Sequence, residues 1–352
     1  MKFVDLSGLP VACASTGEGG TEPVAHGGDL AAARRQFPDA PEPWVDLSTG
    51  INPHTYPLPA LAPDAWSKLP QSEAEEALRV AAARRYGAAD PAMIVIAAGS
   101  QPLIQAVPRL LAPTDVAILG PTYREHAAAW TRHGHAVSEV DSVALLRKRS
   151  VAVVVNPNNP TGRIVPPDEL RQLAAMLVDR QGLLIVDEAF ADLAPADTSI
   201  IESLPRATIV LRSFGKAYGL AGLRLGFAVA HVGVAERLRA EIGPWPVSGP
   251  ALAIGTIALS DSRWLEMLRP ALAADGARFD ALITSCGLAI EGATPLFRLL
   301  SHPRAADIAD ALGSDGVLVR RFVERPNWLR IGLPSGEPAW MRLEQSMRRA
   351  TT

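Results

Sequence analysis

The chain has 352 residues, of which 48% are hydrophobic, 20% charged and 5% aromatic, and this length is enough for about two domains. Its 34 basic and 37 acidic residues nearly cancel and form no long block of one sign, which argues against binding to nucleic acid or to an anionic membrane. Cys13 and Cys286 match neither a disulfide framework nor a paired zinc motif. No apolar run reaches membrane-spanning length. We therefore expect a cytoplasmic protein without a metal site that acts on a small molecule.

The first fifty residues are rich in Gly, Pro and Ala, and predict an arm that lies across the body of the protein or across a partner subunit. Residues 72–86 predict a helix, because acidic residues occupy the first turn, basic residues the last turn, and Gly87 follows. Apolar runs with helical stretches such as 167–180 between them predict a mostly parallel sheet covered by helices, over about residues 70–235. The runs lie at 93–99, 116–120, 151–156, 183–190, 208–214 and 223–230.

The pattern changes after Gly243. A loop at 244–250 is followed by helical stretches over 251–286 and by short strands near 288–300 and 317–332, which predict a smaller α+β lobe. We predict a large domain over residues 50–236 and a small C-terminal domain over 237–352, with the arm of residues 1–49 as part of the small domain.

Lys216 stands just beyond a predicted strand, with Ser213 three residues before it and Arg224 eight residues after it. In an open α/β sheet, the loops at the carboxyl ends of the strands form the ligand crevice. A lysine that is partly desolvated there has a lowered pKa, and its free amine can form a Schiff base. Taken alone, Lys216 is more simply explained as a solvated surface lysine.

Two other strand ends carry polar groups. The turn NPNNPTG at 156–162 contains two prolines and can hold the amide of Asn159 in a fixed direction, although such residues also dominate ordinary turns. Asp187 ends the apolar run LLIVD, where a buried carboxylate implies a cationic partner. The alternative for Asp187 is a cap of the segment that follows.

A candidate phosphate site lies at the start of the helix that follows the first strand. The segment GSQ at 99–101 offers backbone N–H groups and the Ser100 hydroxyl, unless it is an ordinary helix start. Ser213 and Arg224 would complete such a site. Tyr123 follows the second strand, and its ring could stack on a heteroaromatic ligand or belong to the core or its rim.

These motifs, in this order and over nearly the whole chain, resemble the fold-type-I pyridoxal-phosphate enzymes of the class I and II aminotransferase group. The resemblance implies a seven-stranded α/β sheet, pyridoxal 5'-phosphate as the cofactor and a homodimer. It implies that Lys216 forms the Schiff base, that Asp187 pairs with the pyridinium nitrogen and that Asn159 bonds the 3-hydroxyl group. The residues implied to hold the cofactor phosphate or to stack on its ring are Gly99, Ser100, Gln101, Tyr123, Ser213 and Arg224. We place Lys216, Asp187 and Tyr123 in the catalytic group.

The chain departs from the family pattern at two places. Phe190 stands where the family commonly has a tyrosine that bonds the cofactor hydroxyl, three residues after the strand-end aspartate. Leu69-Pro70 stands where many relatives have a tyrosine before a proline, which reaches the phosphate of the neighbouring subunit. One cofactor contact is therefore missing or replaced, and the contribution of a second subunit is open.

Two arginines near the C-terminus are candidates for substrate binding. Arg330 resembles the arginine that binds the substrate carboxylate in this family, a role that suits its planar fork. Arg320 stands where histidinol-phosphate aminotransferases have an arginine near the substrate phosphate. Arg321 alternates to the opposite face of the strand and is expected in solvent. Without the resemblance, these residues would be ordinary surface arginines.

Segments 26–30 (HGGDL) and 45–59 (VDLSTGINPHTYPLP) are similar to the arm of the L-threonine-O-3-phosphate decarboxylases, the cobalamin-biosynthesis branch of the family. This similarity implies that His26 helps to bind the substrate phosphate and that Asn52 lies close to the substrate, together with Asn159. By themselves, His26 and Asn52 would be a loop histidine beside a glycine turn and a turn asparagine before a proline.

The motifs leave the reaction open, because the bond that breaks is the one held perpendicular to the cofactor ring. We predict decarboxylation of L-threonine O-3-phosphate to (R)-1-amino-2-propanol O-phosphate. The alternative is an aminotransferase that acts on histidinol phosphate with 2-oxoglutarate. A non-catalytic regulator on the same scaffold is a third hypothesis, which the short neutral arm and the presence of Lys216, Asp187 and Asn159 disfavour.

Overall fold

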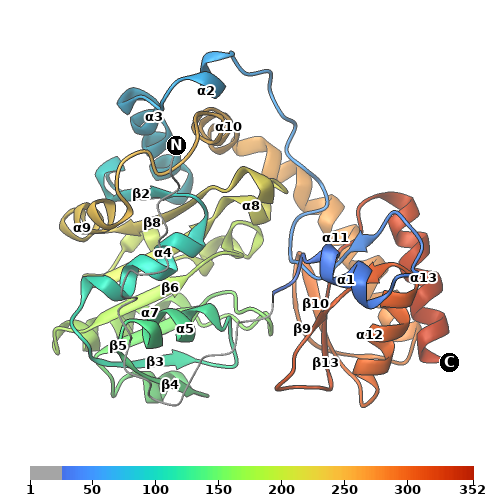
Figure 1. The fold of residues 1–352 in the computed structure, drawn as a ribbon. Helices are drawn as coiled ribbons and strands as arrows, with labels where there is room; N and C mark the ends of the chain where they lie inside the picture. The colour runs from blue at the N-terminus through green and yellow to red at the C-terminus, as the bar shows by residue number, and fades with distance from the viewer. Residues whose placement is uncertain (1–25) are drawn as a thin grey trace, which may run out of the picture.

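The computed structural model describes residues 26–352, so Cys13 and the first half of the predicted arm lie outside the described residues. Figure 1 shows a larger part, built on a broad sheet, beside a smaller part that contains the C-terminal strands together with α1 (Leu30–Gln36). The long helix α11 (Ser262–Ser285) leads from the larger part to the smaller one. The chain is therefore organised around two larger sheets, besides a third sheet of two strands.

The larger part contains a seven-stranded sheet in the order β2-β8-β7-β6-β5-β3-β4. β8 runs antiparallel to both of its neighbours, and the other pairs are parallel. The strands are β2 (Ile94–Ala97), β3 (Asp115–Leu119), β4 (Ala136–Val140), β5 (Val151–Val155), β6 (Leu183–Asp187), β7 (Thr208–Ser213) and β8 (Gly226–Ala230). The predicted α/β class with a mostly parallel sheet is confirmed.

Each of the six apolar runs overlaps a strand of this sheet, but no run predicted β4. β4 lies at the edge of the sheet and pairs only with β3. Its sequence AVSEV carries an exposed Glu139 and a half-buried Ser138. An edge strand with polar residues lacks the continuous apolar run that marks a strand buried on both faces.

Helices cover both faces of the sheet because successive strand residues point to opposite sides. Ile94 and Ile96 pack in one hydrophobic cluster, and Val95 and Ala97 pack in the other. The first cluster includes residues of α3 (Ser72–Tyr86), α7 (Pro167–Val178) and α10 (Gly249–Ser260). The second includes residues of α4 (Ser100–Ala106), α5 (Glu125–Arg132) and α9 (Val232–Ile242). Burial on both faces explains why the strands read as continuous apolar runs.

The smaller part contains a four-stranded antiparallel sheet in the order β12-β13-β10-β9. Its strands are β9 (Ala289–Thr294), β10 (Phe297–Ser301), β12 (Arg320–Arg321) and β13 (Trp328–Gly332). β1 (Val45–Asp46) of the arm pairs in parallel with β11 (Val317–Leu318), so this portion of the arm lies with the C-terminal residues. The predicted domain boundaries, 1–49, 50–236 and 237–352, stay a prediction.

The remaining elements are short or terminal. They are α2 (Asp64–Ser67), α6 (Val143–Leu146), α8 (Phe214–Ala217), α12 (Ala305–Ser314), α13 (Gly336–Thr351) and the 3-10 helices Pro91–Met93, Val107–Leu110, Ala191–Leu193, Ala196–Thr198, Ile201–Ser203 and Ala221–Leu223. The helical stretch predicted over 251–286 is divided between α10 and α11 at Asp261, whose side chain accepts a hydrogen bond from the backbone N–H of Trp264. Asp261 therefore serves as the N-cap of α11.

A buried ionic cluster lies next to the ends of β6 and β7. Arg212 Nη1 is 2.7 Å from Glu188 Oε2, and its Nη2 is 2.7 Å from Asp192 Oδ1. The guanidinium also lies 4.5 Å from the centre of the Tyr86 ring. Burial raises the pKa of Glu188, and the charge of Arg212 opposes that rise. Arg212 is therefore the shared cationic partner of two buried carboxylates.

We predict that Arg212→Leu destabilises the fold by about 3–5 kcal/mol, because it leaves two buried carboxylates without their cation. Urea unfolding followed by circular dichroism measures the change. Arg34→Gln is the matched control, since it breaks the exposed Arg34–Glu42 pair and should hardly move the midpoint. Equal shifts in the two variants would contradict the role of Arg212.

Candidate active site

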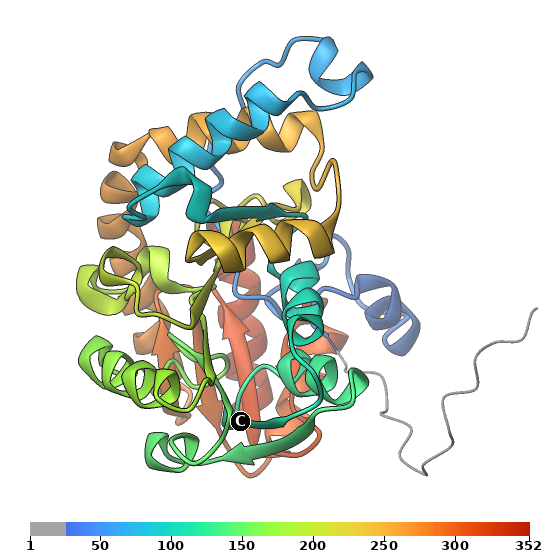
Figure 2. The same cartoon turned by 90° about the vertical axis from the view of Figure 1, so that its left-hand side faces the viewer.

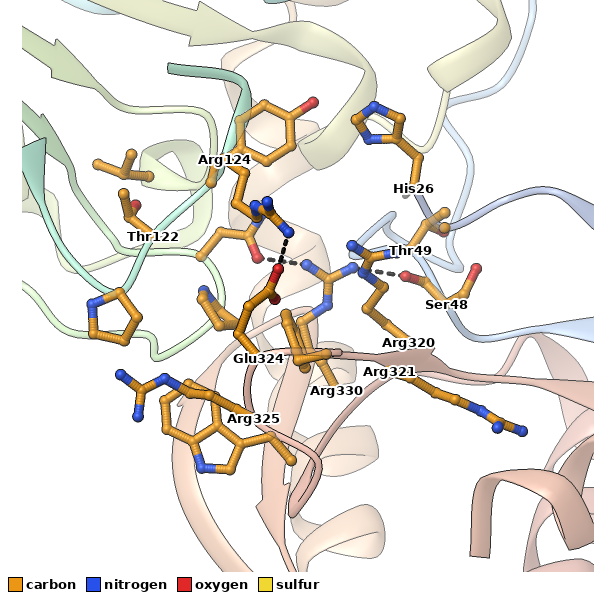
Figure 3. A pocket seen from close by; sticks show the side chains of 18 of the residues that line it. His26, Ser48, Thr49, Thr122, Arg124, Arg320, Arg321, Glu324, Arg325 and Arg330 are labelled. Carbon is orange, nitrogen blue, oxygen red and sulfur yellow. Dashed lines mark hydrogen bonds and ion pairs between the residues drawn. The ribbon is translucent and has the colours of Figure 1, made fainter. Parts of the chain in front are cut away.

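A cavity of about 460 Å³ lies at the carboxyl edge of the seven-stranded sheet, between this edge and the sheet of the smaller part. The carboxyl ends of parallel strands meet at one edge, which is where ligands bind in open α/β sheets. Seven of the predicted site residues line this cavity: His26, Tyr123, Asn159, Asp187, Lys216, Arg320 and Arg330. Figure 3 shows that Arg320 and Arg330 reach in from the smaller part and that His26 enters from the arm.

Lys216 lies in α8, the short helix that directly follows β7. Its Nζ atom is 5.6 Å from the centre of the Phe190 ring. Burial, together with the charges of Arg330 and Arg224, lowers the pKa of Lys216 to about 8, and Asp187 opposes this shift. At pH 7 about a tenth of the lysine is therefore a neutral amine, which is the form that attacks a carbonyl group.

Asp187 ends β6 and is buried, and it has a histidine partner. Its Oδ2 lies 2.9 Å from Nε2 of the buried His126, and its Oδ1 accepts a hydrogen bond from the backbone N–H of Ala189. His126 is in the first turn of α5 and was not predicted as a site residue. His126 therefore fixes the direction of the Asp187 carboxylate, and the cationic partner inferred from the sequence stays a prediction.

Arg330, in β13, is buried beneath the cavity. Its Nη1 donates to Oδ1 of Asn159 at 2.5 Å, and its Nη2 donates to the backbone oxygen of Ser48 at 2.6 Å. Its Nε atom is buried and has no hydrogen-bond partner. Burial lowers the pKa of Arg330 to about 10, so the group stays charged at neutral pH. A buried cation whose partners are neutral is suited to an anionic group of a ligand.

Arg320 stands directly opposite Arg330, because β12 and β13 pair at these two residues. Burial lowers the pKa of Arg320. The next residue, Arg321, forms an ion pair with Asp310 of α12 at 2.5 Å. Arg321 therefore pairs with a surface helix, although it also borders the cavity.

Gly99 and Arg224 lie close together beside the cavity. Gly99 has a φ of 92° and forms the N-cap of α4. The positive φ favours glycine, and a Cβ atom at this position would come within 2.7 Å of Nη2 of Arg224. Ser213 ends β7, and its backbone pairs with Gly226, which itself packs on Gly99. The segments predicted to bind a phosphate are therefore adjacent in space.

A chain of polar contacts leads from these segments to the arm. The Tyr123 hydroxyl donates to Oε1 of Gln101 at 3.3 Å, and Nε2 of Gln101 donates to Glu125 at 2.6 Å. The other oxygen of Glu125 lies 3.0 Å from Nε2 of His26. Burial raises the pKa of Tyr123 to about 12, assisted by Glu125 and Asp187. Tyr123 is therefore a neutral hydrogen-bonding group at neutral pH.

Asn52 does not line the cavity. Its Nδ2 donates to the backbone oxygen of Ala217 at 2.6 Å, and its backbone N–H donates to that of Lys216 at 3.0 Å. Its Oδ1 accepts from the backbone N–H of His54. Asn52 thus holds the segment that carries Lys216 from behind, and the predicted contact with substrate stays a prediction.

Phe190 forms part of the cavity wall, at the position where the family pattern commonly has a tyrosine. Its ring packs edge to face on Phe297, with 5.2 Å between the ring centres, and it faces the amine of Lys216. An apolar ring beside the amine adds to the desolvation that lowers the pKa of the lysine.

Three functional neighbours were not predicted from the sequence: Arg124, Glu125 and His126. Together with Tyr123 they make up the segment YREH. The backbone N–H of His126 bonds to the oxygen of Tyr123, so this turn places Tyr123 at the cavity and His126 on Asp187. The three-residue spacing of Tyr123 and His126 at a helix start was the sequence signal that could have indicated that these residues lie together.

The family model described as Aminotransferase class I and II matches residues 42–342. The chain belongs to this family. The family membership predicted from the motifs is therefore confirmed.

The threonine-phosphate decarboxylase of Pseudomonas aeruginosa is 42% identical over 327 residues, which cover 92% of this chain and 97% of that protein. The threonine-phosphate decarboxylase of a Sinorhizobium species is 41% identical and covers 93% of this chain and 98% of its own length. The histidinol-phosphate aminotransferase of Lactiplantibacillus plantarum is 28% identical over 82% of this chain and 86% of its own length.

Among solved structures, the histidinol-phosphate aminotransferase of Sinorhizobium meliloti in complex with pyridoxal-5'-phosphate superimposes with a TM-score of 0.80. It is 24% identical, and the match covers 94% of this chain and 95% of that chain. This likeness confirms the predicted fold. Within residues 26–352, no helix has both the length and the apolar character needed to cross a membrane.

We predict that Lys216 of the cofactor-free protein titrates near pH 8. Peptide mass spectrometry after brief treatment with an amine-specific reagent at a series of pH values gives the midpoint. Arg330→Gln should move the midpoint to higher pH, because it removes a positive charge that disfavours the protonated amine. A midpoint near the 10.5 of an ordinary lysine would contradict the burial argument.

Proposed function

We propose that this protein is a pyridoxal-phosphate-dependent enzyme that decarboxylates L-threonine O-3-phosphate to (R)-1-amino-2-propanol O-phosphate, a step of cobalamin biosynthesis. The observation that carries the proposal is identity of 42% and 41% to two threonine-phosphate decarboxylases over nearly the full length of all three chains. Identity to the histidinol-phosphate aminotransferase of L. plantarum is lower, at 28%.

The residues of the cavity fit the cofactor. Lys216 supplies a partly neutral amine for its aldehyde, and Asp187 supplies a buried carboxylate for its ring nitrogen. The amide of Asn159 would bond the ring hydroxyl, and the ring of Tyr123 would lie against that of the cofactor. Residues proposed for the cofactor phosphate are Gly99, Ser100, Gln101, Ser213 and Arg224. When bound, the cofactor supplies an electron sink for the pair released at the substrate Cα atom.

Asp187 and His126 act as one unit in this proposal. The carboxylate would keep a proton on the ring nitrogen of the cofactor, and the contact with His126 holds the carboxylate in its direction. Lys216 would handle the proton at the substrate: the bond between Cα and the carboxylate breaks, carbon dioxide leaves, the electron pair stays with Cα and its electron sink, and the protonated form of the lysine returns a proton to Cα. His126 is thus a positioning residue, and Lys216 is a catalytic residue.

Arg330 is proposed to bind the substrate carboxylate, because it is a buried cation with an unpartnered Nε atom in the cavity wall. Asn159 is held by Arg330, so the substrate and cofactor contacts are coupled through one hydrogen bond. Arg320 and His26 are proposed for the phosphate of the substrate. Two anchored ends would fix the orientation of the substrate, and orientation selects the bond that breaks.

The second candidate function is a histidinol-phosphate-type aminotransferase, favoured by the fold neighbour with a TM-score of 0.80. Such an enzyme would break the bond between Cα and hydrogen and would need 2-oxoglutarate to accept the amino group. Arg320 and Lys216 would serve either reaction, so the products decide between the two.

We predict that the cofactor-loaded enzyme releases carbon dioxide and 1-amino-2-propanol O-phosphate from L-threonine O-3-phosphate without any keto acid. Mass spectrometry identifies the products. Lys216→Ala should lower the rate by at least about 100-fold, because it removes the group that moves the proton. Formation of glutamate from histidinol phosphate and 2-oxoglutarate, with no carbon dioxide from L-threonine O-3-phosphate, would establish the aminotransferase instead.

We further propose a homodimer in which the segment around α2 contacts a second copy of the chain. Figure 2 shows this segment projecting from the top of the body. Its large apolar side chains are exposed: Leu58 at 63%, Trp66 at 71% and Leu69 at 61%. Such an apolar patch on a projecting segment favours burial against a partner. Leu69 precedes Pro70 at the position that reaches the neighbouring subunit in relatives with a tyrosine there.

Sedimentation equilibrium tests the dimer. We predict that the wild-type protein has twice the mass of the chain and that Trp66→Glu shifts it toward the monomer, because a buried unpaired charge weakens an apolar interface. Met267→Glu is the matched control, since Met267 is equally exposed at 70% but lies on α11. A monomeric wild-type protein would contradict the proposal.

A further inference from the structure

An ion pair spans the mouth of the cavity. Arg124 follows Tyr123 on the sheet side, and Glu324 lies in the loop between β12 and β13 on the other side. Nη1 of Arg124 contacts Oε1 of Glu324. Figure 3 shows the two side chains extending toward each other, with Arg320 and Arg330 beside them. The pair therefore links the two parts of the protein directly over the cavity.

Both members of the pair also act on Arg320. Burial lowers the pKa of Arg320, Glu324 raises it and Arg124 lowers it again, which places the three charges close together. One carboxylate thus lies near two guanidinium groups. Arg124 and Glu324 are about half exposed, at 53% and 55%, so solvent and a ligand can reach them.

The mouth has an excess of positive charge. The basic residues of the cavity lining are His26, Arg124, Lys216, Arg320, Arg321, Arg325 and Arg330, and the acidic ones are Glu139, Asp187 and Glu324. Asp187 is already bound to His126. A phosphate monoester carries about two negative charges and binds well to paired arginines. Glu324 therefore occupies a position beside Arg124 and Arg320, where a phosphate group would bind well.

We propose that Arg124 is a binding residue for the phosphate of the substrate and that Glu324 is an internal anion that holds this place until the phosphate displaces it. The inference rests on the proposed function, in which the substrate is a phosphorylated amine. Arg124 and Glu324 then determine specificity: a phosphate displaces the single carboxylate, whereas an unphosphorylated amine leaves the ion pair intact.

The proposal gives the two residues effects of opposite sign. Arg124→Gln should weaken binding of 1-amino-2-propanol O-phosphate about tenfold, because it removes a charge-assisted contact. Glu324→Gln should strengthen binding about threefold, because it removes a competing carboxylate. Neither variant should change the affinity for 1-amino-2-propanol, which lacks the phosphate. Isothermal titration of the cofactor-loaded enzyme measures each dissociation constant.

Arg34→Gln and Glu42→Gln are the matched controls. Arg34 and Glu42 also form an arginine–glutamate pair, with side chains exposed to nearly the same extent, 51% and 56%, and neither lines the cavity. Both control variants should bind the phosphorylated compound as the wild type does. The same four variants are titrated with histidinol phosphate and histidinol.

Weaker binding in both Arg124→Gln and Glu324→Gln would mean that the pair is only a structural tie, and this would overturn the proposal. So would a loss that is equal for phosphorylated and unphosphorylated ligands, or a wild-type enzyme that does not prefer either phosphorylated amine. Failure of the proposed function is distinguishable, because an aminotransferase would release no carbon dioxide and would still show the opposite signs with histidinol phosphate.

Discussion

The direction of the strands is the constraint on which the site depends. β3, β5, β6 and β7 run in parallel, so their carboxyl ends deliver Tyr123, Asn159, Asp187 and Lys216 to a single edge. β8 is antiparallel to both β7 and β2, and two reversals bring the carboxyl end of β2, with Gly99, to the same edge. Groups that are more than a hundred residues apart in sequence therefore converge without any long loop.

Positive charge concentrated at this edge determines the chemistry. Asp187 is bound to His126, whereas within residues 26–352 the hydrogen bonds of Arg330 go to the neutral oxygens of Asn159 and Ser48. The unbalanced charge of Arg330 adds to burial in lowering the pKa of Lys216. The same charge attracts an anionic substrate, so one arrangement both activates the lysine and selects the ligand.

The sequence predicted those features that depend on local pattern. Continuous apolar runs marked the strands buried on both faces, and polar residues directly after them marked the carboxyl edge. The edge strand β4 was not predicted, because it pairs on one side only and its sequence AVSEV is not a continuous apolar run. Two contacts were not predicted because their members are distant in sequence. His126 and Asp187 are 61 residues apart, and Arg124 and Glu324 are 200 residues apart. Nothing in either segment indicates which distant carboxylate it meets, and Asn52 likewise shows its role only through Lys216 and Ala217.

The residues at the base of the cavity would not distinguish the two candidate reactions. Lys216, Asp187 and Asn159 would serve decarboxylation and transamination equally, which explains why the chain is similar to enzymes of both kinds. The outcome depends on whether the carboxylate or the hydrogen of Cα stands perpendicular to the cofactor ring. That angle is fixed by where the far end of the substrate is anchored. In the proposed function Arg320, Arg124 and Glu324 would surround this end, so the charges at the mouth of the cavity would set the geometry in which Lys216 acts.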